Sequence, residues 1–96
     1  MSGSDARATV TIVNRLGMHA RPAMSFVETA SRFNSEVELR RTDGEFDDPV
    51  NGKSIMQLMM LAATQGTEIE ISTNGEDAHE ACEALRKLVE SGFDEG

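Results

Sequence analysis

The chain has 96 residues, of which 39% are hydrophobic and 27% are charged, which is the composition of one ordinary globular domain. Its formal net charge of −8 argues against nucleic acid as a partner, because phosphate backbones attract clustered lysines and arginines. A single cysteine forms no internal disulfide, which fits a reducing compartment. No apolar secretion signal is visible, and the longest apolar run, residues 55–63, is far shorter than the ~20 residues that span a bilayer. We therefore expect a cytoplasmic protein that does not enter membranes.

Three segments alternate apolar and polar residues with the period of a half-buried β-strand, namely residues 8–13, 36–40 and 68–72. A weaker fourth candidate covers residues 46–50, where Pro49 would suit only an edge strand. Because one face of each strand is charged, we expect a sheet that is covered by helices on one side only.

Three further segments have helical periodicity: residues 20–33, 54–63 and 77–91. Pro22 suits the first turn of the first helix, and Gly92 suits the position just past the third, with Phe93 folding back onto its last turn. The apolar stripe of the first helix is predicted to contain Ala20, Ala23, Met24, Val27 and Ala30.

The resulting order is β-α-β-β-α-β-α, which indicates an α+β domain. We expect a flexible N-terminus over residues 1–6, a single domain over residues 7–93 and a C-terminal tail over residues 94–96.

Charge is unevenly distributed along the chain. Residues 1–34 hold two acids and four arginines, a balance of +2, whereas residues 35–96 hold fifteen acids and five bases, a balance of −10. No carboxylate occurs between Ala6 and Val27. This anion-free segment favours a site for an anion, although chance clustering in a short window gives the same pattern.

His19 lies at or just before the start of the first predicted helix, where unpaired backbone N–H groups and the helix dipole favour phosphate. Arg21 adds a guanidinium that can grip phosphoryl oxygens, and Gly17 permits a close approach or a positive φ. A neutral imidazole is also a nucleophile. On the residues alone, a second interpretation is as well supported as an anion site. In it, His19 only caps the helix and Arg21 is a solvated surface charge.

Residues 17–23, Gly-Met-His-Ala-Arg-Pro-Ala, closely resemble the phosphorylation-site sequence of the HPr family of histidine-containing phosphocarriers of the phosphoenolpyruvate-dependent phosphotransferase system. Residues 51–56, Asn-Gly-Lys-Ser-Ile-Met, resemble the second signature of that family, around its regulatory serine. The resemblance extends over residues 7–93. It implies an open-faced β-sandwich in which three helices cover one side of a four-stranded antiparallel sheet.

The same resemblance implies a role for each residue of the site. His19 would receive a phosphoryl group on Nδ1 from phosphorylated Enzyme I and pass it to an EIIA-type acceptor, while Arg21 and the backbone amide of Ala20 steady it. The protein would act as a phosphoryl carrier rather than an enzyme, with no cofactor. Leu16, Asn14 and residues 91–95 look more like the nitrogen-related branch, NPr, and the acidic stretch 42–49 fits neither branch well.

Ser54 has two compatible interpretations. It is a good N-cap for the second helix, and by resemblance it is the site at which a serine kinase would regulate His19. A phosphate at a helix N-terminus adds charge without melting the helix.

The second helix is apolar on two arcs, one formed by Leu58, Leu61 and Ala62 and the other by Ile55, Met56, Met59 and Met60. A methionine stripe is more often core than interface, but both arcs cannot lie flat on one sheet. The resemblance makes the second arc the exposed one. It implies that partners dock on Gly17, Met18, Ile55, Met56 and Met59.

Other readings of the sequence remain open. His79 and Cys82 are spaced as neighbours on the third helix, but no further His or Cys completes a zinc site, so we expect no metal. An enzyme that uses His19 as base or nucleophile would need a second catalytic group, which the sequence does not reveal. A purely regulatory binder that has lost phosphotransfer would not need His19 and Arg21, so the presence of both residues argues against it.

We therefore expect a phosphoryl carrier, and we expect it to be a monomer.

Overall fold

A computed structural model of the chain describes residues 4–44 and 48–94. The elements follow one another in the predicted order, with one short 3-10 helix added at the end. They are β1 (Ser4–Thr11), α1 (Ala20–Ala30), β2 (Glu36–Arg41), β3 (Val50–Asn51), α2 (Ile55–Met60), β4 (Glu68–Gly75), α3 (Ala78–Glu90) and η1 (Gly92–Asp94). None of the helices in the described part of the chain is long and apolar enough to cross a membrane.

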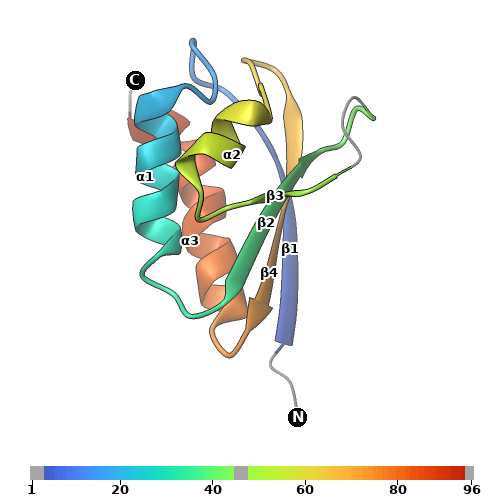
Figure 1. Cartoon of the computed structure of the whole chain (residues 1–96), viewed down its shortest axis with the longest axis vertical. Coiled ribbons are helices and arrows are strands. Elements are labelled where there is room, and N and C mark those ends of the chain that lie inside the picture. The colour runs from blue at the N-terminus through green and yellow to red at the C-terminus, as the bar shows by residue number, and fades with distance from the viewer. Residues whose placement is uncertain (1–3, 45–47, 95–96) are drawn as a thin grey trace.

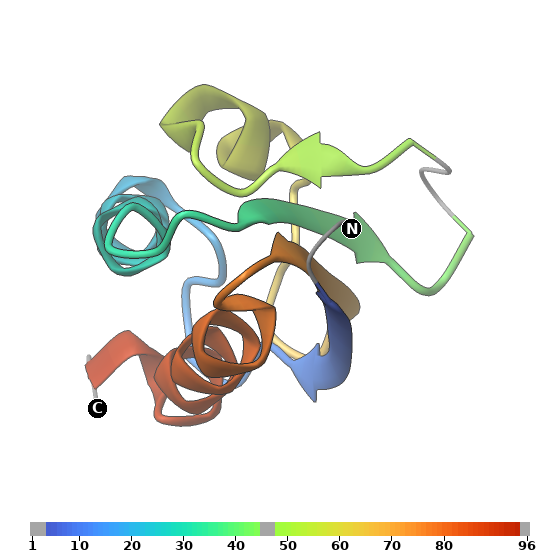
Figure 2. The ribbon, with the colours of Figure 1, turned by 90° about the horizontal axis from the view of Figure 1, so that it is seen from below.

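The four strands form one antiparallel sheet in the order β1-β4-β2-β3. All three α-helices cover the same face of this sheet (Figure 1), and the view from below separates the helical layer from the strands (Figure 2). Along β2, Val37 and Leu39 are buried while Glu36, Glu38 and Arg40 are exposed. The predicted α+β open-faced sandwich is therefore confirmed, because each strand turns its apolar residues toward the helices.

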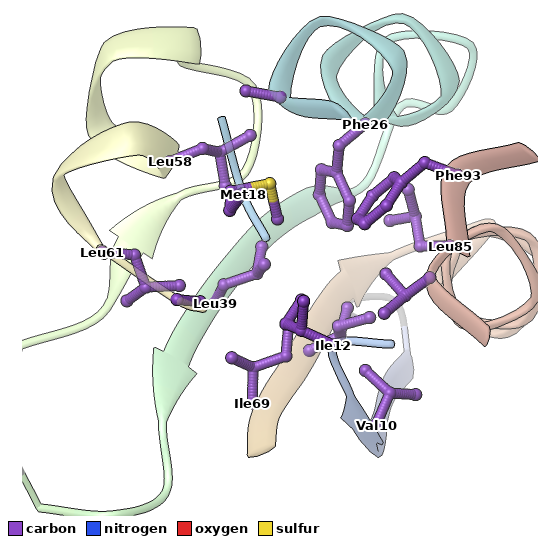
Figure 3. Close-up of a cluster of buried hydrophobic side chains, with 14 of the residues drawn as sticks. Val10, Ile12, Met18, Phe26, Leu39, Leu58, Leu61, Ile69, Leu85 and Phe93 are labelled. Atoms are coloured by element: carbon purple, nitrogen blue, oxygen red, sulfur yellow. The ribbon is translucent and has the colours of Figure 1, made fainter. Parts of the chain in front are cut away.

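The core lies between the sheet and the helices (Figure 3). Large, fully buried side chains come from β2, β4, the three α-helices and the residues just after β1 and α2: Ile12, Phe26, Leu39, Leu58, Leu61, Ile69, Ile71, Leu85 and Val89. Phe93, in η1, is also buried and lies near Phe26 and Leu85. The predicted return of Phe93 onto the end of α3 is thus confirmed, and the positive φ of Gly92 permits the reversal.

The outer strands differ from their predicted bounds. β1 begins at Ser4 rather than at residue 8, because its pairing with β4 continues as far as Ser4 opposite Gly75. β3 has only two residues, Val50 and Asn51, paired with β2. Phe46, at the start of the predicted strand 46–50, lies outside the described residues, as do residues 1–3 and 95–96 of the termini.

The predicted inward stripe of α1 is partly wrong. Met24 is 51% exposed and Ala20 is also exposed. The buried face instead carries Pro22, Ala23, Phe26 and Ala30. Residues two positions apart point to nearly opposite sides of a helix, so Met24 and Phe26 cannot both face the sheet. Burying the larger aromatic ring removes more apolar surface from water, and Phe26 takes the inward position.

Two helices end earlier than predicted. α1 stops at Ala30 rather than at residue 33, and its last amides turn to carbonyls three residues back, as in the bond from Phe33 N to Ala30 O at 3.1 Å. α2 stops at Met60 because Ala62 adopts a left-handed conformation with φ 55°, which no helix continues.

Candidate functional site

The loop between β1 and α1 is closed by the side chain of Asn14. Its Nδ2 donates to the carbonyl of Gly17 at 2.8 Å, and the Gly17 amide donates back to the carbonyl of Asn14 at 3.2 Å. Asn14 is buried, so these bonds are shielded from water. The sequence did not reveal this role, although an asparagine just before a glycine-containing turn is a known turn signal.

Gly17 is held against the segment that follows α2. Its φ is +70°, and a Cβ at this position would lie 2.5 Å from the carbonyl oxygen of Ala63. The next amide, that of Met18, donates to the same oxygen at 2.8 Å. Both predicted reasons for a glycine, positive φ and close approach, are therefore confirmed.

His19 is the N-cap residue of α1, with φ −89° and ψ −170°. Its amide donates to the carbonyl of Gly17 at 2.9 Å, and its carbonyl accepts the amide of Ala23 at 3.0 Å. The imidazole makes no capping hydrogen bond to the helix, so the interpretation that His19 serves only as a cap is wrong. The ring is half-buried, and its Nε2 is shielded from solvent.

The first turn of α1 has the features of an anion site. It contains no acidic residue, and the amides of Ala20 and Arg21 have no carbonyl to pair with inside the helix. The Arg21 side chain is exposed and forms no ion pair with any residue in ranges 4–44 and 48–94. Donor amides, a positive helix end and the exposed Arg21 therefore lie at the same end of α1 as the imidazole of His19.

A hollow of about 790 Å³ lies in front of this turn. Its lining includes Arg15, Leu16, His19, Arg21, Phe93 and Asp94. The C-terminal turn thus reaches the site and brings one carboxylate, Asp94, into an otherwise basic surrounding. Neither this contact nor the 70% exposure of Leu16 was expected from the sequence.

Ser54 caps α2 as predicted. Its Oγ accepts the amide of Gln57 at 3.2 Å, which satisfies one of the unpaired donors of the first turn. The preceding residue, Lys53, donates from Nζ to the carbonyl of Phe33 at 2.8 Å and so ties the start of α2 to the end of the α1 segment.

The two apolar arcs of α2 separate as the resemblance implied, except at Ala62. Leu58 and Leu61 are buried, whereas Ile55, Met56 and Met59 are exposed, Met56 to 76%. Ala62, expected on the arc of Leu58, is exposed, because the chain turns away from the helix there with a positive φ.

Two of the expected docking residues are buried instead. Met18 is only 5% exposed and its side chain lies in the core beside Leu58 (Figure 3), and Gly17 is buried as well. Neither residue therefore offers a broad surface to a partner.

The remaining titratable candidates on α3 lie apart from this site. Cys82 is buried, and that burial raises the pKa of its thiol, while His79 is exposed. Within residues 4–44 and 48–94, no group of three or more His, Cys, Asp or Glu side chains is placed to hold a metal ion.

Comparison with known proteins agrees with this geometry. The family model described as the PTS HPr component phosphorylation site matches residues 6–91. The phosphocarrier protein HPr of Neisseria meningitidis is 49% identical over 90 residues, which are 94% of this chain and 97% of that protein. The phosphocarrier protein NPr of Escherichia coli is 42% identical over 89 residues, which are 93% and 96% of the two chains.

The fold also matches a solved structure. The crystal structure of HPr from Thermoanaerobacter tengcongensis superposes with a TM-score of 0.86 and 42% sequence identity, and the match covers 95% of this chain and 98% of that one. Sequence, fold and the histidine at the start of α1 lead to one assignment: the chain belongs to the HPr family of phosphocarrier proteins of the phosphotransferase system.

Proposed function

We propose that the protein accepts a phosphoryl group from phosphorylated Enzyme I on Nδ1 of His19 and passes it to an EIIA-type protein. The observation that carries this proposal is the imidazole at the start of α1, whose Nε2 is buried and which makes no capping bond. The burial of Nε2 supports the assignment to Nδ1 that the family resemblance implies.

The transfer needs positioning and charge neutralisation more than covalent catalysis. The Nδ1 lone pair attacks phosphorus, the N–P bond forms, and the bond from phosphorus to its donor on Enzyme I breaks, with its electron pair left on that donor. The amides of Ala20 and Arg21 and the guanidinium of Arg21 neutralise the phosphoryl oxygens. The reverse step delivers the group to the acceptor, and a site at the protein surface lets it leave.

Partners would dock on the exposed arc of α2, formed by Ile55, Met56 and Met59, next to the buried residues Gly17 and Met18 of the phosphorylation loop. The exposure of the three arc residues supports this assignment, because unbranched methionines adapt to several partner surfaces. We propose Ser54 as the point of control. A phosphate added by a serine kinase would retain the helix cap and place negative charge on the apolar docking arc.

We also propose that the carrier is monomeric, works in the cytoplasm and binds no nucleic acid. Relatives named HPr and NPr match it to similar extents, so its acceptor could belong to either the sugar or the nitrogen branch. Incubation of the phosphorylated protein with one EIIA of each branch would assign the branch by the faster loss of label.

The central test uses the two histidines of the chain as a matched pair. Incubation with phosphoenolpyruvate and Enzyme I, followed by intact mass spectrometry, should add one acid-labile phosphate. His19→Ala should abolish the addition, and His79→Ala should retain it. A phosphate that survives His19→Ala, or no phosphate on the wild-type chain, would contradict the proposal.

A further inference from the structure

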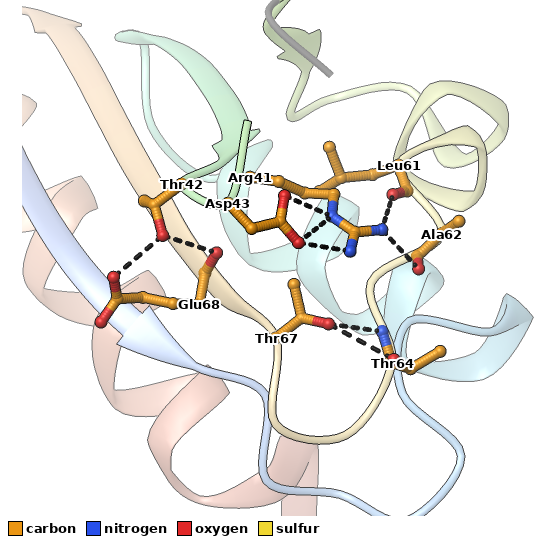
Figure 4. Close-up of polar contacts among 8 residues, drawn as sticks. All are labelled: Arg41, Thr42, Asp43, Leu61, Ala62, Thr64, Thr67 and Glu68. Atoms are coloured by element: carbon orange, nitrogen blue, oxygen red, sulfur yellow. Dashed lines mark hydrogen bonds and ion pairs between the residues drawn. The ribbon is translucent and has the colours of Figure 1, made fainter. Parts of the chain in front are cut away.

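The guanidinium of Arg41, at the end of β2, lies against the C-terminal end of α2 (Figure 4). Its Nη1 donates to the carbonyl of Leu61 at 3.4 Å and to that of Ala62 at 3.2 Å. Its Nε and Nη2 bind Asp43, with the shortest distance 2.6 Å between Nη2 and Oδ2. The Arg41 side chain is only 15% exposed, so these bonds are partly protected from water.

The end of α2 has particular need of such a contact. The helix has six residues and no basic residue in its last turn, so its final carbonyls lack a cation on their own element. The chain then leaves the helix through Ala62 at φ 55°, a conformation that is costly for a residue with a Cβ. Arg41 supplies from β2 the donor and the charge that the helix end lacks.

The next carbonyl along the chain holds the phosphorylation loop. Ala63 O accepts the amide of Met18 at 2.8 Å, directly before His19, and Gly17 packs on the same oxygen. Arg41 therefore binds the carbonyls of Leu61 and Ala62, and the next carbonyl, that of Ala63, binds the loop of His19. The exposed arc of α2 ends at Met59, two residues before the first of these carbonyls.

We propose that Arg41 is a positioning residue for phosphoryl transfer. It fixes the end of α2 so that the docking arc and the loop of His19 keep one relative position, and Asp43 orients its guanidinium. This inference rests on the proposed function, since it assumes that a partner contacts both regions together. The Asp43 side chain is 45% exposed, so its ion pair with Arg41 stabilises little by itself, and the contribution of Arg41 lies in the two carbonyl bonds.

The neighbouring arginine provides a matched control. Arg40 is on the same strand but on the open face of the sheet, where its Nε binds Glu70 Oε1 at 3.0 Å. Amide hydrogen exchange followed by NMR should show the Met18 amide exchanging roughly tenfold faster in Arg41→Met than in the wild type, because its acceptor is no longer held. Arg40→Met should leave that rate unchanged.

The second readout is steady-state transfer from Enzyme I. If docking requires a relative position that the variant adopts only part of the time, the KM for the carrier should rise roughly threefold to tenfold in Arg41→Met while kcat changes little. Arg40→Met should retain both values. The inference would be overturned if Arg41→Met and Arg40→Met had the same Met18 amide exchange rate and the same KM.

Arg41→Lys keeps the test valid if Arg41→Met does not fold. An ammonium cannot bind Asp43 and both carbonyls in one planar fork, so we expect a Met18 exchange rate between those of the wild type and a fully released loop. A wild-type rate in a folded Arg41→Lys would overturn the inference. Exchange needs no phosphoryl transfer, so a wild-type chain that stays unphosphorylated contradicts the proposed function and leaves the exchange result standing.

Discussion

Ser35 donates its hydroxyl hydrogen to Oδ1 of Asp77 over 2.5 Å, although the two residues are 42 positions apart in the chain. The same carboxylate accepts the amides of Asn34 at 2.8 Å and of Ser35 at 2.9 Å. Asp77 is the N-cap residue of α3, but its side chain makes no capping bond. It serves instead to fasten the turn before β2 to the start of α3.

These hydrogen bonds hold the pKa of Asp77 below its ordinary value of 3.8, with the bond from the Ser35 hydroxyl as the largest cause. A carboxylate whose pKa is lower in the folded state stabilises the fold above its unfolded pKa, and that stabilisation is lost as the pH falls through the folded value. Asp77→Asn should therefore lower the melting temperature at pH 7. The difference from the wild type should shrink below about pH 4. Calorimetry from pH 7 to pH 2 measures the melting temperatures of the wild type and Asp77→Asn, and Glu76→Gln is the control. A difference in melting temperature that stays constant with pH would contradict the prediction.

Gly17→Ala should destabilise the fold and displace the phosphorylation loop. The left-handed φ costs about 1–2 kcal/mol for any residue with a Cβ, and the clash with Ala63 O adds to it. Gly44→Ala is the matched control, because Gly44 has φ +79° and open space where a Cβ would lie. Urea unfolding of both variants separates the two effects, and equal losses would show that the close approach contributes nothing.

Leu58→Ala and Met56→Ala should affect different properties, stability and docking respectively, because the two residues lie on different arcs of α2. Removing the fully buried Leu58 side chain should cost about 2–5 kcal/mol of unfolding free energy. Removing the exposed Met56 side chain should change stability by less than about 0.5 kcal/mol and raise the KM for the carrier with Enzyme I. Denaturant titration and transfer kinetics measure both, and an unchanged KM in Met56→Ala would remove that residue from the docking surface.

Ser54→Ala should cost about 1 kcal/mol of unfolding free energy, because the amide of Gln57 loses its acceptor. Ser54→Asp should retain that stability, since aspartate also caps helices, while its charge on the docking arc should slow phosphorylation of His19. Urea unfolding and the rate of label uptake from Enzyme I give the two readouts. Uptake by Ser54→Asp at the rate of Ser54→Ala would contradict the proposed control.

The sequence predicted those features that depend on local patterns. Alternation located β1, β2 and β4, and the position of His19 before a helical stripe located the site. It did not predict which face of α1 is turned inward, because that depends on the side chains that the sheet presents to the helix. The predicted stripe therefore contained the exposed Met24 and lacked the buried Phe26. Nor could the sequence predict the bonds from Arg41 to Leu61 and Ala62, which join residues 20 and 21 positions apart. Such contacts leave no periodic signal in the chain.

The position of β1 at the edge of the sheet has a consequence for biosynthesis. Among the strands of residues 4–44 and 48–94 it pairs with β4 alone, and the paired residues Asp5 and Asn74 are 69 positions apart. During synthesis β1 must therefore wait, unpaired, until these later residues have been made. Closing so large a loop is slow compared with local helix formation. The sheet is thus completed only after β4 has been translated, and nascent chains that stop before β4 should remain open to proteases and chaperones.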